Sequence, residues 1–267
     1  MKLSKSNSNH FIITDYFVVE GNGLENFYGV LGNEKYACIG WKPKDQNEMG
    51  LILHNYGTIK SIQLNIDYNF SLSGVYGHTV GGLVCYNESG GVIDDCSVTM
   101  IKGSFNFTST VGGLVGYNYG TIKNCWATVN VETSGTFGVI VGVNYGTVTE
   151  SVGMGNITQK VTKYEGCYEL SKVGGIAGIN AKNGEIIGEI INSVGGTIDD
   201  SYLSGVIDVS YVDDESLAPY SGPIAGENNG EIIDCSNYGY AIDTGNLHSW
   251  WAWFHTYDQL RNINNTI

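Results

Sequence analysis

One short run of glycine, aliphatic and asparagine residues recurs along this chain, and it restricts the fold more than any other feature. The clearest copies read VGGLVCYNESGGVIDDC at residues 80–96 and VGGLVGYNYGTIKNC at residues 111–125. Looser copies surround Asn55, Asn144, Asn180 and Asn228, and successive repeat asparagines lie between 26 and 48 residues apart. A copy of this length is one supersecondary unit, which buries its apolar side chains against neighbouring copies. The recurrence therefore predicts one elongated array of stacked repeats.

The residues that follow each asparagine predict strands. In four copies an aliphatic side chain stands four positions after the asparagine, and from Cys125 onward apolar and polar residues alternate. Such alternation with β-branched residues is typical of a strand. The NYG and NNG sequences predict turns in which Asn and Gly adopt positive φ. The predicted fold is all-β, a right-handed parallel β-helix (solenoid) of about six or seven coils.

Stacked coils would place like residues above one another at the strand spacing of about 4.8 Å. The asparagines would then cap turn amides or form an amide ladder. Cys96 and Cys125 would occupy equivalent positions, with Ser151 next in the same column. Buried free thiols are favoured for this column because unpaired cysteine is among the most buried residue types. A disulfide is the alternative.

These residues resemble a known family. The runs at 111–125 and 80–96, and more loosely the copies across residues 49–243, resemble the GLUG repeat, a glycine-rich motif of bacterial surface proteins. The motif occurs in adhesin-like proteins and in non-catalytic parts of some immunoglobulin A peptidases. Met49 and Pro223 stand where the clearest copies have glycine. The resemblance implies an extracellular location at the bacterial cell surface and a role as spacer or adhesive stalk, and it supplies no catalytic residues.

The array divides the chain into three parts. Residues 1–48 are predicted to form an N-terminal cap and a lead-in coil, residues 49–243 the GLUG-like β-helix repeats, and residues 244–267 a C-terminal helical cap. A β-helix exposes sheet edges at its ends, which favour aggregation unless they are covered. Trp250, Phe254 and Tyr257 recur at helical spacing in the last part, behind an N-cap residue at Ser249. An aromatic platform for sugars or a partner is the alternative for the tryptophans there.

Charge and hydropathy exclude several classes of partner. The 267 residues carry a formal charge of −14, from 13 basic and 27 acidic side chains, which opposes binding to nucleic acid and to anionic membranes. No apolar run approaches the roughly 18 residues of a membrane helix. The start MKLSKSNSNHF lacks the apolar centre of a signal peptide. We expect no nucleic acid partner, no membrane insertion and no signal peptide in this chain; the expected partners are a host or bacterial surface glycan or protein, or further copies of the chain.

Polar residues that precede the cysteine or serine column are the candidates for chemistry. They are Ser61, Asp95, Asn124, Glu150, Asp200 and Asp234. Stacked carboxylates repel, which raises their pKa or recruits a cation. Hydrogen-bond acceptance at a bend is the favoured role, a calcium site at Glu150, Asp200 and Asp234 is the alternative, and carboxylate catalysis comes last. The chain's one arginine, Arg261, lies in the predicted cap, so we expect no enzyme activity, no catalytic residues and no cofactor apart from this calcium alternative.

Tyrosines flank the asparagine column. Tyr86 should lie beside Tyr117, and Tyr119 beside Tyr145. Cross-strand aromatic pairs stabilise a sheet by about 0.2–1 kcal/mol each, which explains them without a ligand. Glycan binding by these four tyrosines is the alternative, and three long insertions at 158–172, 181–196 and 208–222 are further candidates for a contact surface.

The predicted function is therefore a non-enzymatic repeat module of a bacterial cell-surface protein, acting as an adhesin-like stalk or binding scaffold. Two alternatives belong to other classes. A self-assembling structural protein would use the tendency of coils to stack end to end, and a polysaccharide-active β-helix enzyme would use a carboxylate cluster.

Overall fold

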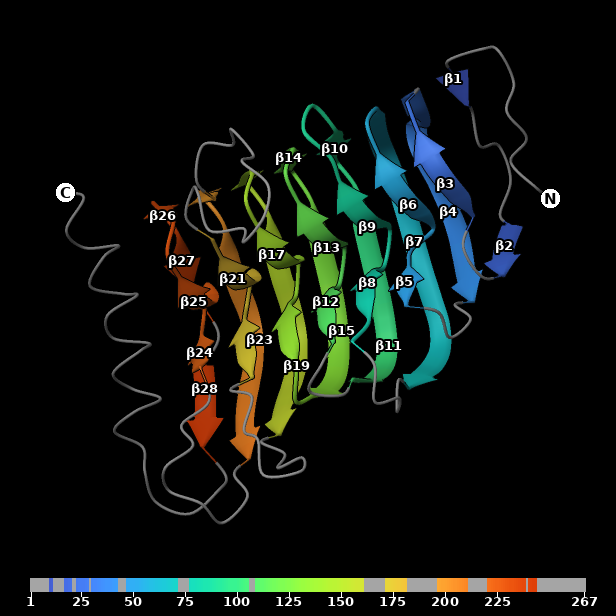
Figure 1. The fold of residues 1–267 in the computed structure, drawn as a ribbon. Coiled ribbons are helices and arrows are strands. Elements are labelled where there is room, and N and C mark those ends of the chain that lie inside the picture. Colours follow the sequence, from blue (N-terminus) through green and yellow to red (C-terminus); the bar gives the residue numbers. More distant parts are fainter. Residues whose placement is uncertain are drawn as a thin grey trace.

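The computed structural model describes residues 10–11, 17–20, 23–28, 30–42, 47–71, 77–105, 109–160, 171–181, 196–210, 220–238 and 240–243. These residues form strands, turns and bends, and no helix occurs among them. Figure 1 shows the strands side by side in chain order, from the blue N-terminal strands to the red C-terminal strands. The strands pair in parallel with equivalent segments of neighbouring repeats. The all-β prediction is confirmed, and the arrangement is consistent with a parallel β-helix.

The strands belong to three sheets. Sheet A contains β1 (His10–Phe11), β2 (Phe17–Glu20), β4 (Val30–Lys42), β7 (Thr58–Ser71), β10 (Val92–Asp94), β11 (Ser97–Phe105), β14 (Thr121–Lys123), β15 (Trp126–Thr133), β18 (Thr147–Thr149), β19 (Val152–Lys160), β22 (Thr197–Asp199), β23 (Tyr202–Ser210), β26 (Glu231–Ile233), β27 (Ser236–Asn237) and β28 (Tyr240–Asp243). Sheet B contains β3 (Leu24–Phe27), β6 (Ile52–Asn55), β9 (Val84–Asn87), β13 (Val115–Asn118), β17 (Val141–Asn144), β21 (Ala177–Asn180) and β25 (Ala225–Asn228). Sheet C contains β5 (Glu48–Met49), β8 (Thr79–Gly81), β12 (Thr110–Gly112), β16 (Thr136–Gly138), β20 (Lys172–Gly174) and β24 (Tyr220–Gly222).

We call a coil one passage of the chain through a strand of sheet C, a strand of sheet B and the sheet A strands that follow. The strand register places equivalent residues of successive coils opposite one another, and Asn118 pairs with both Asn87 and Asn144. The predicted cysteine column is also present. The backbone N–H of Cys96 donates to Cys125 Sγ at 3.4 Å, and that of Cys125 donates to Ser151 Oγ at 3.3 Å. Like residues therefore lie above one another, as the repeats predicted.

A narrow apolar core runs through the stack. Each coil contributes one aliphatic side chain from the link between sheets C and B and another from the short sheet A strand, and all are buried. The first column is Leu51, Leu83, Leu114, Ile140, Ile176 and Ile224, and the second is Ile59, Ile93, Ile122, Val148, Ile198 and Ile232. Upstream of residue 49, β3 pairs with β6 and β4 with β7, so these strands extend the same stack.

The residues with positive φ lie at the bend within sheet A, and not at the asparagine turns where the sequence predicted them. Positive φ was expected at the asparagine turns, but none of the described residues in the NYG and NNG sequences has it. Instead, six non-glycine residues of the polar column carry φ between 40° and 54°: Ser61, Asp95, Asn124, Glu150, Asp200 and Asp234. This left-handed conformation turns the chain sharply between the short and the long sheet A strands, as between β14 and β15. Asp and Asn tolerate it better than most residues because their short polar side chains bond locally.

The turn glycines have a different role, which is close packing between coils. A Cβ atom on Gly120 would lie 2.2 Å from the carbonyl oxygen of Gly91, and one on Gly146 would lie 2.1 Å from that of Gly120. No side chain fits at such a distance. Glycine is therefore required in this column because one turn packs directly against the next, and not because the backbone needs a positive φ. The predicted C-terminal helical cap, residues 244–267, lies outside the described residues.

Candidate functional site

The repeat asparagines form a continuous amide ladder between sheets B and A. Each Nδ2 donates to Oδ1 of the asparagine in the next coil: Asn55 to Asn87 at 2.7 Å, Asn87 to Asn118 and Asn118 to Asn144 at 2.8 Å, Asn144 to Asn180 at 2.9 Å, and Asn180 to Asn228 at 2.8 Å. Asn118 Nδ2 also contacts the carbonyl oxygen of Thr147 at 3.2 Å. Because these bonds use the amide groups, the most conspicuous residues of the repeat hold the coils together.

A second ladder, formed by aromatic rings, runs beside the amide ladder on the outside of the stack. We call it the aromatic ladder, and it contains Tyr28, Tyr56, His54, Tyr86, Tyr117, Tyr119 and Tyr145. The two predicted pairs are present: the ring centroids of Tyr86 and Tyr117 lie 5.6 Å apart, and those of Tyr119 and Tyr145 lie 5.2 Å apart with nearly parallel planes. His54 stacks on Tyr86 with centroids 4.9 Å apart, and it stands before its repeat asparagine at the position that Tyr86 and Tyr117 fill in the next coils, where the sequence predicts a surface rung of the stack.

The stacked geometry determines what the aromatic ladder offers to a ligand. Face-to-face rings cover one another's faces, so within the ladder the edges and hydroxyl groups point outward. Burial raises the pKa of Tyr86 and of Tyr119, and for Tyr119 the neighbouring hydroxyls of Tyr145 and Tyr117 raise it further. These phenols therefore stay neutral at physiological pH. Glycan binding by Tyr86, Tyr117, Tyr119 and Tyr145 stays a prediction, and a sugar ring has no free aromatic face to stack on between them.

Glu88 interrupts one column of the aromatic ladder. It stands directly after the repeat asparagine, where the neighbouring coils have Tyr56 and Tyr119, and its Oε1 lies 2.7 Å from Nδ1 of His54. Both side chains are half-buried, with 24% and 29% of their surface exposed. The contact joins two coils at the point where the tyrosine is missing.

Near its N-terminal end, the polar bend column contains hydrogen bonds between neighbouring coils. Ser61 Oγ donates to Asp95 Oδ2 at 2.9 Å, and Asn124 Nδ2 donates to Asp94 Oδ1 at 2.9 Å. These contacts agree with hydrogen-bond acceptance at a bend. Among the described residues no group of three His, Cys, Asp or Glu side chains is arranged to hold a metal ion. The calcium site at Glu150, Asp200 and Asp234 therefore stays a prediction for which the side-chain geometry gives no support.

Four cysteines in the repeat coils are free and buried. They are Cys85, Cys96, Cys125 and Cys235. Burial raises the pKa of the Cys125 thiol, and the hydrogen bond and charge of Cys96 raise it further. Burial also raises the pKa of Cys235 to about 11. Because the thiolate is the reactive form, Cys125 and Cys235 are poor nucleophiles, and all four buried cysteines serve as small core side chains.

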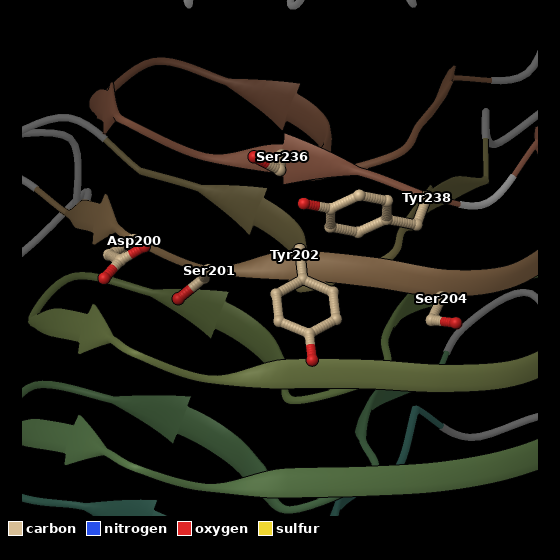
Figure 2. A pocket seen from close by; sticks show the side chains of 6 residues that line it. All are labelled: Asp200, Ser201, Tyr202, Ser204, Ser236 and Tyr238. Atoms are coloured by element: carbon tan, nitrogen blue, oxygen red, sulfur yellow. The ribbon is translucent and has the colours of Figure 1, made fainter.

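A hollow on the outside of sheet A was not predicted from the sequence. Figure 2 shows the side chains that line it, with the ring of Tyr238 beside that of Tyr202. The hollow has a volume of about 430 Å³ and is lined by Asp200, Ser201, Tyr202, Ser204, Ser236 and Tyr238. We call it the Tyr202–Tyr238 hollow. The two rings meet edge to face, with centroids 5.3 Å apart and an interplanar angle of 90°.

The sequence carried a weak signal for this hollow. Asp200 was singled out for the bend column, but Tyr202 and Tyr238 follow the serine or cysteine position at different distances in their coils and share no repeat position. The three insertions proposed as a contact surface fall largely on residues 161–170, 182–195 and 211–219, which lie outside the described residues.

Comparison with known protein families finds one motif in two repeats of the chain. Residues 76–102 and 108–132 match the family model named the GLUG motif, so these two adjacent repeats carry that motif. The predicted resemblance is confirmed for them. No significant match to a curated protein or to a solved structure was found. Within the described ranges, no helix is long and apolar enough to span a membrane.

Proposed function

We propose that this chain, which carries the GLUG motif in two adjacent repeats, is a non-enzymatic module of a bacterial cell-surface protein and acts as an adhesin-like stalk or binding scaffold. The observation that carries the proposal is the internal use of the repeat residues. The asparagine amides bond to one another from Asn55 to Asn228, and the glycines allow turn-to-turn contact. Because the repeat residues bind the coils to one another, the repeat suits a protein whose function depends on shape and rigidity.

The surface of the stack supports the same reading. A formal charge of −14 keeps an extended rod soluble and opposes collapse onto anionic lipid or nucleic acid. We further infer a right-handed β-helix of six or seven coils, since parallel crossovers nearly always have that hand, with residues 244–267 as its C-terminal helical cap.

Protease treatment of intact bacterial cells that produce the protein tests the location. We expect peptides of this chain to be released while a cytoplasmic marker protein stays intact. Release from lysed cells alone would contradict the proposal. A binding assay then separates stalk from adhesin, since a pure stalk leaves the attachment of coated beads to host cells or bacterial envelopes at the level of uncoated beads.

A self-assembling structural protein is a second candidate, favoured by one observation at the C-terminal end of the stack. Asn228 accepts from Asn180, but within the described part of the chain no further asparagine lies above its own Nδ2. Another copy could continue the ladder from that donor. Sedimentation velocity of the full chain over a hundredfold range of concentration tests this, because a constant monomer sedimentation coefficient contradicts self-assembly.

A further inference from the structure

We infer that the Tyr202–Tyr238 hollow is a binding site for an uncharged pyranose sugar. The site is separate from the aromatic ladder, and binding there does not depend on the chain being a surface stalk. Its ligand class follows from three features. They are the perpendicular ring pair of Tyr202 and Tyr238, which we call the aromatic corner, a rim of hydroxyl and carboxylate groups, and the negative charge of the chain.

The aromatic corner differs from every pair in the aromatic ladder. Ladder rings lie within 20° of parallel and cover one another's faces, whereas Tyr202 and Tyr238 are perpendicular. An edge-to-face pair leaves ring faces that the partner ring does not cover. Tyr238 is 73% exposed, so its ring meets solvent directly. The apolar C–H face of a sugar ring can pack on such a surface while the sugar hydroxyls stay hydrated. Tyrosine suits this contact because its ring is apolar and its hydroxyl is polar.

The register explains why the hollow forms at this end of sheet A. Tyr202 pairs with Val152 on one side and with Ser236 on the other, while Ser204 pairs with Met154. The backbone N–H of Tyr238 donates to the carbonyl of Leu203, which sets Tyr238 near Ser204. Two tyrosines therefore alternate with two serines across neighbouring coils. Where the preceding coil has Met154, the small Ser204 leaves space.

The rim of the hollow supplies hydrogen-bonding groups suited to a polyol. Ser204, Ser236 and the Asp200 carboxylate are exposed, and Figure 2 shows Asp200 on one side of the ring of Tyr202 and Ser204 on the other. Hydroxyl groups donate and accept, and an ionised carboxylate accepts strongly from sugar hydroxyls. Asp200 has a left-handed backbone with φ of 40°, which fixes where its side chain leaves the chain.

Charge selects among ligand classes. Asp200 and the formal charge of −14 oppose a uronic or sialic acid. An alkylammonium group would be attracted, but recognition of such cations relies on ring faces that surround the charge. Here the two rings contact each other and the other lining residues are polar. The observations therefore favour a neutral sugar.

Saturation-transfer NMR with methyl glycosides of glucose, galactose, mannose and N-acetylglucosamine, each at several millimolar, tests the site on the full chain. We expect at least one to bind, with transfer strongest to the ring protons of one sugar face. Tyr238→Ala should weaken binding about tenfold, which corresponds to a loss of about 1.4 kcal/mol. Ser204→Met should abolish it, because that variant fills the hollow with the residue found at the paired position of the preceding coil.

Matched variants make the outcomes decisive. Tyr28→Ala removes a tyrosine that is 71% exposed, at the far end of the aromatic ladder, and should leave binding unchanged. Asp200→Asn keeps a residue that tolerates positive φ and should weaken binding several-fold. Equal melting temperatures of Ser204→Met and wild type show that the fold is intact. No binding by any of the four glycosides, binding unaffected by both Tyr238→Ala and Ser204→Met, or saturation by tetramethylammonium alone would each overturn the inference. None of these results bears on cell-surface location.

Discussion

At the scale of single residues, Asn118 shows how much the amide ladder contributes to the stability of the fold. Its side chain is fully buried, accepts from Asn87 and donates to Asn144, both at 2.8 Å. Asn118→Ala leaves a donor and an acceptor of its neighbours unpaired inside the stack. We expect a loss of about 2–6 kcal/mol in the free energy of unfolding, since each of the two unsatisfied buried groups costs about 1–3 kcal/mol. Urea denaturation followed by circular dichroism measures it.

Asn130 offers a matched control for this variant. It is an exposed residue of β15 in the same coil. Asn130→Ala should change stability by less than about 0.5 kcal/mol, the usual range for surface positions. If Asn118→Ala and Asn130→Ala unfold at the same urea concentration, the amide ladder does not stabilise the fold.

Glu150 occupies the left-handed bend with φ of 49°, although it lacks the short side chain that helps Asp and Asn there. A left-handed backbone costs a non-glycine residue about 1–2 kcal/mol, whereas glycine adds about 0.4–1 kcal/mol of chain entropy to the unfolded state. Glu150→Gly should therefore stabilise the protein by about 0.5 kcal/mol. Thermal unfolding gives the sign.

Glu132→Gly is the comparison for the bend variant, because Glu132 is an exposed residue of the extended strand β15. Glycine there should destabilise by about 0.5–1 kcal/mol through backbone entropy, and the change also removes the exposed ion pair of Glu132 with Lys160, which acts in the same direction. Opposite signs for the two Glu→Gly changes support strain at the bend, and the same sign for both refutes it.

The asparagine column and the bend at Glu150 also show which features can be predicted from the sequence and which cannot. The asparagine column could be predicted because the same residue recurs at a fixed place in every copy. The bend at Glu150 and Asp200 was predicted, but its left-handed backbone was not, because neither residue is a glycine that would indicate positive φ. The nearby turn glycines marked the wrong place, since Gly120 is there for lack of space and not for its φ.

At the scale of elements, the aromatic ladder joins the sheet B strands and the turns that follow them. Tyr119 stacks on Tyr145 at 5.2 Å and on Tyr117 at 6.5 Å. The double variant Tyr117→Ala, Tyr119→Ala removes three ring contacts, each worth about 0.2–1 kcal/mol. We expect a lower melting temperature and an unchanged profile on a glycan array. A profile that loses its signals while the variant stays folded would assign glycan binding to these tyrosines after all.

The ion pair between β20 and β25 ties two coils together and should give the fold a dependence on pH. Lys172 Nζ lies 2.6 Å from Glu227 Oε2. Burial raises the pKa of Glu227, but hydrogen bonds from Lys172 and Asn229 and the charge of Lys172 outweigh it, so the net shift is downward. A carboxyl with a lowered pKa stabilises the fold above its unfolded pKa, near 4.3, and this stabilisation is lost as the pH falls through the folded pKa.

Glu227→Gln isolates that contribution. Wild type should be the more stable protein at pH 7, and the difference in melting temperature should shrink steadily below about pH 4.3. Lys60→Gln is a suitable control because Lys60 lies 3.9 Å from Asp94 and is more exposed. A difference between wild type and Glu227→Gln that stays constant from pH 7 to pH 3 would show that the pair does not stabilise the native state.

The elements and their register could be predicted from the repeats, whereas the Tyr202–Tyr238 hollow could not. Period-two alternation identifies strands, and the repeat spacing fixes which residues lie above one another. The hollow depends on diagonal neighbours in two coils, with small Ser204 and Ser236 between two large rings. These residues share no repeat position, so the sequence does not predict the hollow and only the three-dimensional structure reveals it.

At the scale of the whole molecule, the stack has a direction. The asparagines of the amide ladder from Asn55 to Asn180 donate toward the C-terminal end, and at the opposite end buried Phe27 occupies the position that pairs with Asn55. An apolar residue thus closes the N-terminal end of the ladder. Within the described residues, β24, β25 and β26 are the last strands at the opposite end of sheet C, of sheet B and of the short-strand row of sheet A. These strands would pair readily with another chain if they were bare.

Removal of residues 244–267, the predicted cap, should therefore turn the chain into a self-associating one. We expect residues 1–243 to form oligomers that grow with concentration in sedimentation velocity, while the full chain stays monomeric under the same conditions. Self-association should increase with salt, since the formal charge of the full chain is −14 and screening lowers the repulsion between copies. If residues 1–243 remain monomeric from 50 mM to 1 M salt, the last strands need no cover and the capping role of the C-terminal segment is refuted.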